Sequence, residues 1–227
     1  MLPIRDDQPT RTFPLVTFLL ILANALVWLL ELSLGTGQAL DTFYYQYAFI
    51  PGVLTGAYQA PTGAVAPYFL SIFTSMFIHG SWSHILGNML FLWIFGNNIE
   101  DYLGHGKYLL FYLVGGVVAA LFHMLSGPSS QVPTIGASGA IAAVMGAYFF
   151  LYPTARIHTL VVFIFITSVQ IPAWIFLGIW FLMQLFEGTY GAAQGVAVWA
   201  HVGGFLFGVL AAWFASRHRT PRVEYYV

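Results

Sequence analysis

The stretch Thr134-Ile135-Gly136-Ala137-Ser138-Gly139-Ala140 follows a loop rich in Gly, Pro and Ser and opens an apolar run that continues to Leu151. This pattern predicts that Ser138 lies in the first turn of a membrane helix, between glycines. Free backbone N–H groups at a helix N-terminus favour developing negative charge, and glycines allow a substrate backbone to approach closely. The alternative is a small-residue packing surface, which is common between membrane helices. The rest of the chain favours a reactive hydroxyl.

Composition indicates an all-α polytopic membrane protein. Of 227 residues, 59% are hydrophobic and 7% are charged, whereas soluble domains carry about 25% charged residues. Several spans of ~20 residues leave no room for a second globular domain. The absence of cysteine excludes disulfides, thiolate catalysis and Cys-ligated metals. The net charge of −1 indicates nothing about partners, but the lack of a basic patch predicts no nucleic-acid partner.

Six apolar segments predict a bundle of six transmembrane helices. They are Phe13–Leu34, Ser83–Leu103, Tyr108–Leu125, Ser138–Tyr152, Ile171–Phe186 and Val196–Ser216. The membrane domain is therefore expected at residues 13–216, between a short cytoplasmic N-terminus at 1–12 and a basic cytoplasmic tail at 217–227. The first apolar run is longer than the h-region of a signal peptide and no convincing cleavage site follows it, which favours a membrane span.

Two further segments, one of mixed composition and one apolar, fit no span. Residues 35–70 are punctuated by Gly and Pro and carry a cluster of aromatic side chains, which predicts a segment at the membrane interface. A helix over residues 157–169 would be about 20 Å long, too short for a hydrocarbon core of ~30 Å. We therefore expect residues 157–169 to form an interfacial segment or to extend a neighbouring helix.

The positive charges predict the sidedness. The seven basic residues are Arg5, Arg11, Lys107, Arg156, Arg217, Arg219 and Arg222. With six spans, all of them fall on one side of the membrane, as the positive-inside rule requires. Both termini are thus predicted to be cytoplasmic. The compact chain, without a visible organellar presequence, predicts a prokaryotic plasma membrane.

The second, fourth and sixth spans then all run from outside to inside, so polar residues near their starts share one depth. His84 and Asn88 lie one turn apart on the second span, Ser138 opens the fourth, and His201 lies near the start of the sixth. Ionisable groups inside a membrane are functional candidates by default. A serine, two histidines and an asparagine supply a nucleophile, a base and oxyanion donors, which are the parts that acyl transfer needs.

Three motifs in this order resemble the rhomboid family of intramembrane serine proteases, over roughly residues 70–210. The motifs are Gly136-Ala137-Ser138-Gly139, His84-x-x-x-Asn88 and Ala200-His201-x-x-Gly204-x-x-x-Gly208. The run from Asn88 to Gly96, followed by Glu100 and Gly104, is also similar to that family. The glycine stripe after His201 predicts that the sixth span presses against another helix.

The resemblance implies a role for each residue. Ser138 would be the nucleophile, and His201 the general base and then the acid for the leaving amine. Asn88, His84 and the backbone N–H of Ser138 would form the oxyanion hole. The family uses a Ser–His dyad without a carboxylate, and no cofactor or metal is expected. The implied partners are the lipid bilayer and transmembrane protein substrates, which are cut near the outer face after partial unwinding. Substrate segments weakened by Gly or Pro should be preferred.

The chain departs from the family pattern at two places. Many members carry a Tyr four residues after the nucleophile that stacks on the histidine, but this position is Ala142, so the group that orients His201 stays open. Several family members also carry a Trp-Arg pair in the first loop, and no such pair precedes the second span here. Asn24 and Gln184 are predicted to form hydrogen bonds between helices, and Glu100 to be a structural hydrogen-bond centre at the inner end of the second span.

Other function classes lack their sequence features. A zinc protease would need His-Glu-x-x-His and an aspartyl protease Gly-x-Gly-Asp; the chain contains neither. Rhomboid-like proteins that bind clients without cleaving them lose the serine or the histidine, and both are present. A small transporter would place polar residues along a midplane path, often in inverted repeats; here they cluster at one depth. The sequence identifies no particular substrate and no oligomeric state.

Overall fold

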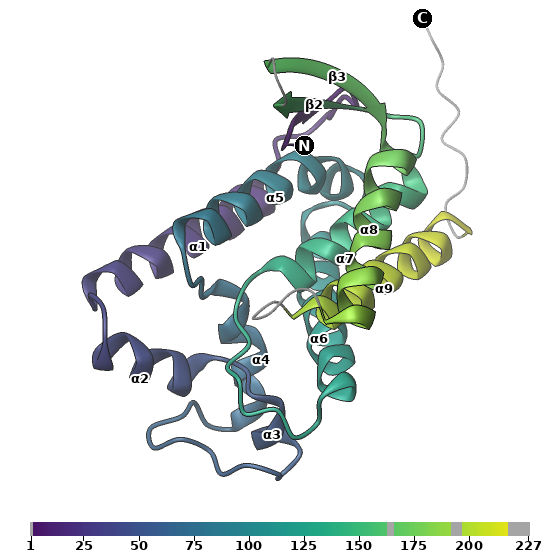
Figure 1. Ribbon diagram of the computed structural model, residues 1–227. Helices are drawn as coiled ribbons and strands as arrows, with labels where there is room; N and C mark the ends of the chain where they lie inside the picture. Colours follow the sequence, from purple (N-terminus) through teal and green to yellow (C-terminus); the bar gives the residue numbers. More distant parts are fainter. Residues whose placement is uncertain (1, 163–165, 192–196, 218–227) are drawn as a thin grey trace, which may run out of the picture.

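Six long helices dominate the computed structural model, which describes residues 2–162, 166–191 and 197–217 (Figure 1). They are α1 Leu15–Ser33, α5 Trp82–Leu103, α6 His105–Ser126, α7 Ser138–Leu151, α8 Ala173–Tyr190 and α9 Val198–Arg217. Each begins within three residues of the start predicted for it. The predicted start of the last helix, at residue 196, and the basic tail from residue 218 lie outside the described residues.

Within the described part of the chain, three helices are long and apolar enough to cross a membrane: α1, α6 and α9. Helix α7 has only 14 residues, and α5 carries buried polar side chains, among them Asn88, Asn98 and Glu100. The chain is a multi-pass membrane protein, as the family described below also shows. The number of six spans, the cytoplasmic termini and the limits at 1–12, 13–216 and 217–227 stay predictions.

Helix α7 lies at the centre of the bundle, surrounded by α5, α6, α8 and α9 (Figure 1). All residues from Gly139 to Tyr148 are buried. A helix that is hydrophobic on every side is stable only when other helices surround it. Its central position therefore explains why α7, about 21 Å long at 1.5 Å per residue, is apolar all round and carries few large side chains on its first turns.

Helices α7 and α9 pack against each other through glycine, and their contact is the most extensive one between helices. A Cβ added to Gly204 would overlap the carbonyl oxygen of Gly139, and one added to Gly208 would overlap the carbonyl oxygen of Ala143. In the opposite direction, a Cβ on Gly146 would overlap the carbonyl oxygen of Phe205. The prediction that the glycine stripe after His201 presses α9 against another helix is confirmed.

The all-α prediction is wrong in one region, because the chain also forms a three-stranded antiparallel sheet. Its strands are β1 Leu2–Asp6, β2 Arg156–Val162 and β3 Ile166–Pro172, in the order β1-β2-β3. The segment 157–169, expected to be interfacial or to extend a helix, is therefore mostly strand. Its β-branched residues alternate, and Ile157 and Thr159 are both buried on one face. Such residues favour a pleated, half-buried surface over a helix.

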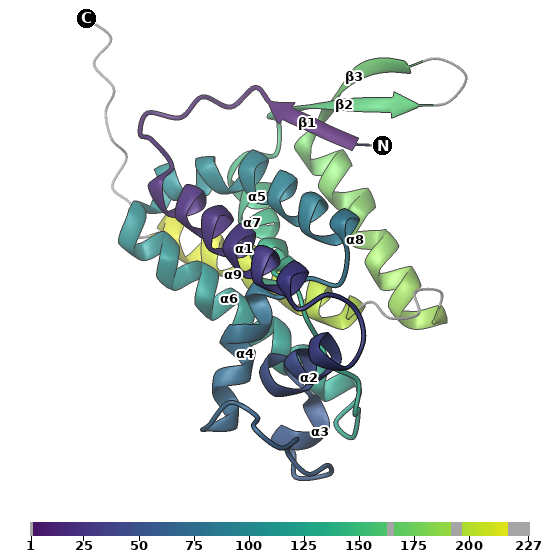
Figure 2. The same cartoon turned by 90° about the vertical axis from the view of Figure 1, so that its left-hand side faces the viewer.

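The sheet and the short helices lie at opposite ends of the bundle (Figures 1 and 2). At the sheet end, the Tyr148 hydroxyl of α7 donates a hydrogen bond of 2.5 Å to Asp6 of β1, and burial raises the pKa of this carboxyl. At the other end, residues 35–77 fold into short helical pieces. They are α2 Gln38–Tyr47, α3 Pro51–Leu54, α4 Ser71–Thr74 and the 3₁₀ turns Tyr68–Leu70 and Ser75–Phe77.

Glu100 joins the start of α1 to the end of α5. Its buried carboxylate accepts hydrogen bonds of 2.7 Å from the backbone N–H groups of Val16 and Thr17. It also pairs with Nδ1 of His105 at 2.6 Å. The first N–H groups of a helix have no intrahelical acceptor, and Glu100 satisfies two of them in α1. The prediction that Glu100 is a structural hydrogen-bond centre is confirmed.

Candidate active site

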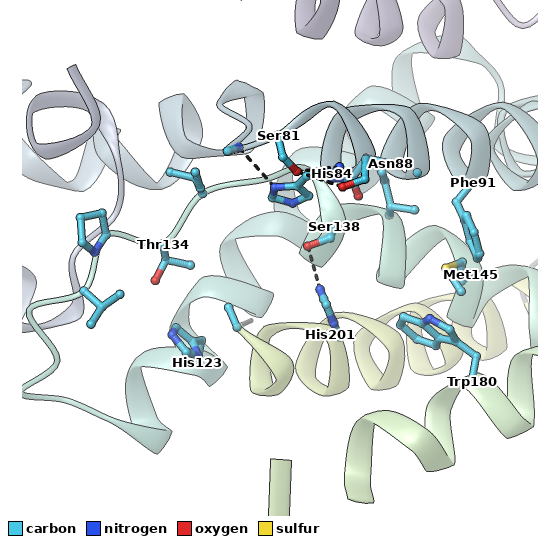
Figure 3. Close-up of a pocket in the computed structure, with 18 of the residues that line it drawn as sticks. Ser81, His84, Asn88, Phe91, His123, Thr134, Ser138, Met145, Trp180 and His201 are labelled. Atoms are coloured by element: carbon cyan, nitrogen blue, oxygen red, sulfur yellow. Dashed lines mark hydrogen bonds between the residues drawn. The ribbon is translucent and has the colours of Figure 1, made fainter. Parts of the chain in front are cut away.

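Ser138 and His201 form a direct hydrogen bond, although 63 residues separate them in the sequence. The hydroxyl oxygen of Ser138 lies 2.7 Å from Nε2 of His201 (Figure 3). Ser138 is the first residue of α7, and His201 lies in the first turn of α9. The close packing of α7 and α9 brings these two starts together. A hydroxyl at this distance from an imidazole nitrogen can pass its proton to that nitrogen as it attacks.

The other ring nitrogen of His201 bonds to α8. Its Nδ1 lies 2.5 Å from Oε1 of Gln184, a buried side chain. An amide oxygen only accepts hydrogen bonds, so Nδ1 carries the proton and Nε2 is the acceptor for the Ser138 hydroxyl. The predicted interhelical hydrogen bond of Gln184 is confirmed. The interhelical hydrogen bond predicted for Asn24 is wrong as far as its amide nitrogen is concerned. This nitrogen donates to the carbonyl of Leu20 within the same helix, α1.

The ring of His201 also packs against α8. The centroids of Trp180 and His201 are 5.8 Å apart, and Trp180 contacts Phe205 of α9 as well. The α7 residue at the position of the stacking tyrosine, Ala142, instead gives room for the close approach of Gly204. A small residue at position 142 thus allows the tight contact between α7 and α9, and the ring of His201 is contacted by α8 and not by a tyrosine of α7.

Asn88 and His84 face the same cavity from α5 (Figure 3). Helix α5 is capped by Ser81, whose side chain accepts a hydrogen bond of 3.2 Å from the backbone N–H of His84. Asn88 is one turn further along. Its Nδ2 is buried and has no hydrogen-bond partner among the described residues. A buried donor without a partner is costly and rare, and an amide aimed into a cavity is a ready donor for a negatively charged oxygen.

Gly136 shapes the loop before Ser138. Its φ of +117° is one that residues with a side chain rarely adopt, and its N–H donates a hydrogen bond of 2.8 Å to the carbonyl of Ser75. A Cβ added to Gly136 would lie 2.6 Å from Nε2 of His84. Only glycine therefore lets this loop pass directly beside His84.

A further histidine, His79, packs against the ring of His84. It is fully buried, and its ring lies 4.9 Å from the ring of His84, centroid to centroid. The carboxylate of Glu31 in α1 accepts a hydrogen bond of 3.1 Å from the backbone N–H of His79. Burial in this loop lowers the pKa of His79 to about 4, because removal from water disfavours the charged imidazolium. His79 does not line the cavity and belongs to the packing beside His84.

The cavity joins all four predicted side chains. It has a volume of about 800 Å³, within the range of about 300–1,000 Å³ that is usual for ligand pockets. Ser138, His201, His84 and Asn88 all line it. One wall is apolar, and the other is the loop before α7; the apolar wall consists of Phe91, Ile141, Met145 and Trp180. Nothing in the sequence pointed to Trp180, because its position depends on how α8 crosses α9.

Metal coordination finds no support in the described residues 2–162, 166–191 and 197–217. No group of three His, Cys, Asp or Glu side chains there is placed to hold a metal ion. The arrangement around Ser138 combines a hydroxyl, an imidazole whose Nε2 accepts from that hydroxyl, and further hydrogen-bond donors within one cavity. These are the components of acyl transfer.

Comparison with known proteins identifies the family. The model of the rhomboid domain matches residues 66–218. Rhomboid protein 1, mitochondrial, of Saccharomyces cerevisiae is 30% identical over 155 residues, which cover 65% of this chain and 42% of the yeast protein. The putative rhomboid protease YdcA of Bacillus subtilis is 28% identical over 141 residues, covering 62% of this chain and 64% of the relative.

A third relative, presenilin-associated rhomboid-like protein A, mitochondrial, of Danio rerio, is 31% identical over 171 residues, which cover 69% of this chain and 41% of the relative. The chain thus matches less than two thirds of the length of each of these relatives. The domain match itself extends over most of the helical bundle, including α5 to α9. This chain therefore belongs to the rhomboid family, whose members are generally intramembrane proteases.

Proposed function

We propose that the protein is an intramembrane serine endopeptidase, which hydrolyses peptide bonds in or near the transmembrane helices of other membrane proteins. The observation that carries this proposal is the 2.7 Å hydrogen bond between the Ser138 hydroxyl and Nε2 of His201. Membership of a family whose members are generally proteases supports it, as do relatives that are named rhomboid proteases.

Because Nε2 of His201 is unprotonated and faces the Ser138 hydroxyl, it can act as the base in the reaction. The Ser138 oxygen attacks the carbonyl carbon of the scissile bond, and its proton passes to Nε2 of His201. The C–N bond then breaks, and His201 gives this proton to the leaving amine, so that an ester on Ser138 remains. A water molecule attacks the ester with His201 again as base, which releases the new carboxyl end and restores the hydroxyl.

Three donors are proposed to hold the oxyanion. The backbone N–H of Ser138 belongs to the first turn of α7, where N–H groups have no intrahelical acceptor. Nδ2 of Asn88 is a buried donor without a partner among the described residues, and His84 lies beside the same loop. Donors fixed in place before the reaction stabilise charge without reorganisation, and one such donor contributes about 10²–10³ in kcat.

The apolar wall of the cavity suits a substrate segment that comes from a lipid bilayer. Phe91, Met145 and Trp180 line this wall beside Ser138. A peptide bond inside a helix has its carbonyl engaged in the helix, so the segment must unwind before it is attacked, and Gly or Pro makes unwinding easier. We propose transmembrane proteins as the substrates. The relatives include mitochondrial, chloroplastic and bacterial proteins, and the prokaryotic plasma membrane stays a prediction for this chain.

The test is labelling of the detergent-purified protein with a fluorophosphonate probe, followed by mass spectrometry of the adduct. The wild type should carry the probe on Ser138, and the variants Ser138→Ala and His201→Ala should not be labelled. Ser33→Ala is the matched control, since Ser33 lies at the end of α1 and bonds only to the carbonyl of Leu30 among the described residues; this variant should be labelled like the wild type.

Cleavage of a transmembrane substrate in liposomes completes the test. Loss of cleavage in Ser138→Ala, with a folded and inserted protein, is the expected result. Unchanged cleavage in Ser138→Ala contradicts the proposal. A folded wild type that binds the substrate but neither cleaves it nor reacts with the probe would instead be a client-binding member of the family.

A further inference from the structure

We propose that Gln184 is the positioning residue of His201, with its side-chain amide in the place that a carboxylate occupies in Ser-His-Asp proteases. This inference rests on the proposed protease function and concerns the same site. It answers the question that Ala142 leaves open, namely which group orients the histidine.

Both nitrogens of the His201 ring are engaged, one on each side. Nε2 lies 2.7 Å from the Ser138 hydroxyl, and Nδ1 lies 2.5 Å from Oε1 of Gln184. Among the described residues these are its two side-chain hydrogen bonds. Two bonds on opposite sides of the ring fix its rotation, and the amide oxygen fixes the tautomer in which Nε2 can accept a proton.

The orientation of the Gln184 amide is itself determined by its neighbour on α8. Nε2 of Gln184 lies 3.4 Å from Oε2 of Glu187, which is three residues further along the same helix. A carboxylate accepts hydrogen bonds from an amide NH₂ but repels an amide oxygen. A flipped amide would therefore lose both bonds, since its oxygen would face Glu187 and its NH₂ would face a protonated Nδ1.

The result is a hydrogen-bonded array of carboxylate, amide, imidazole and hydroxyl, from Glu187 through Gln184 and His201 to Ser138. It connects α8, α9 and α7. Gln184 is buried, and a neutral amide at this depth avoids the desolvation cost of a buried carboxylate. Because the amide carries no net charge, it stabilises the imidazolium less than an aspartate does, so its loss should cost less than the factor of about 10⁴ seen when the aspartate of a triad is neutralised.

The experiment compares two variants at this position. Gln184→Met has a similar length and no hydrogen-bonding oxygen, so the ring should lose its fixed tautomer. We expect the rate of Ser138 labelling, and kcat for a transmembrane substrate in liposomes, to fall by about 10- to 100-fold. KM should change by less than about threefold, because Gln184 touches His201 and not the cavity.

The rescue variant exchanges the two residues, Gln184→Glu combined with Glu187→Gln. A carboxylate at position 184 accepts from Nδ1 of His201, and an amide at position 187 donates to that carboxylate, so the array is restored with the acid and the amide in reverse order. This double variant should recover labelling and kcat to at least about a third of the wild-type value. Met183→Leu, next to Gln184 but exposed, is the matched control and should behave like the wild type.

The outcomes separate this inference from the proposed function. Wild-type rates in a folded Gln184→Met protein would overturn the positioning role and leave the protease intact. Equal losses in Gln184→Met and in the double variant, with a lower Tm or a raised KM, would show a packing role and also overturn it. A wild type that is folded but neither labelled nor active would instead remove the proposed function.

Discussion

Gly204 of α9 lies so close to the main chain of α7 that a Cβ on it would overlap the carbonyl oxygen of Gly139. Gly139 directly follows Ser138, and Gly204 comes three residues, almost one turn, after His201. The distance between hydroxyl and imidazole is thus fixed by a contact between two backbones. Backbone atoms move aside less readily than flexible side chains. A methyl group added at Gly204 should therefore change the distance between Ser138 and His201.

Gly204→Ala should therefore separate α7 from α9 and lengthen the 2.7 Å bond between Ser138 and His201. A misplacement of about 1 Å costs about 100-fold in rate, and overpacking costs about 1–3 kcal/mol in stability. Fluorophosphonate labelling and thermal unfolding in detergent measure the two effects. Gly106→Ala is the control, because a Cβ on Gly106 in α6 meets nothing within 4 Å. Wild-type labelling in Gly204→Ala would contradict this account of the dyad.

Asn88→Ala should lower kcat by about 10²–10³ and leave KM nearly unchanged, because the lost Nδ2 donor acts on charge that exists only in the transition state. Steady-state cleavage of a transmembrane substrate in liposomes measures both constants. Asn97→Ala, on the same helix but at its other end, should keep the wild-type kcat. A raised KM with unchanged kcat in Asn88→Ala would place Asn88 in substrate binding and not in the oxyanion hole.

Gly136→Ala should abolish most labelling of Ser138, although Gly136 has no side chain to contribute. The new Cβ would lie 2.6 Å from Nε2 of His84, so either the loop or His84 must move. The matched variant is Gly37→Ala, which also has a positive φ, +99°, but nothing within 4 Å. Both variants should lose about 1–3 kcal/mol from backbone strain, as thermal unfolding would show, and only Gly136→Ala should lose reactivity. Equal labelling of the two would exclude the collision with His84.

The stability of the fold should depend on pH through His79. Burial lowers its pKa to about 4, from 6.5 in the unfolded chain. Between these values the unfolded state binds more protons, so stability falls as the pH falls through this window. The wild type should therefore lose up to about 2 kcal/mol more than His79→Phe between pH 7 and pH 5.

Denaturant unfolding in detergent at the two pH values measures this difference. The groups that face His79 are Glu31 of α1, Tyr44 of α2 and His84 of α5. They are present in both proteins, so the difference between the two proteins measures the imidazole of His79 together with its charge interaction with His84. Parallel losses in the wild type and in His79→Phe would show that His79 does not titrate in this window.

The helices and the order of the site residues could be predicted because their signals are local. Apolar runs and their breaks marked the helices, and the rule that three of them start on one side brought His84, Ser138 and His201 to one depth. The structure brings these three side chains and Asn88 to one cavity. Their catalytic roles stay a prediction until the variants are measured.

The sheet could not be predicted in the same way, because strand pairing is not local. Leu2 pairs with Leu160, and neither segment alone has a sequence property that predicts pairing with a segment more than 150 residues away. The alternation of β-branched residues from Ile157 to Val161 was a usable signal for a strand. A polar residue in an apolar helix predicted an interhelical hydrogen bond for Gln184, but not that its partner is His201, since the partner depends on the rotation of α8 about its own axis.

β1 has a consequence for the handling of the protein. It covers one side of β2 with an antiparallel ladder, in which Leu2 pairs with Leu160 and Asp6 with Ile157. β1 is itself an edge strand of the sheet, but Pro3 has no N–H and Arg5 and Asp6 are charged, which are features that blunt an edge. Without Leu2–Asp6, the more apolar β2 would become the edge strand, with a row of unpaired N–H and C=O groups that is a template for pairing with another chain. A short N-terminal segment thus replaces an apolar sheet edge by a charged, proline-containing one, and a tag or truncation that disturbs it would favour self-association through β2.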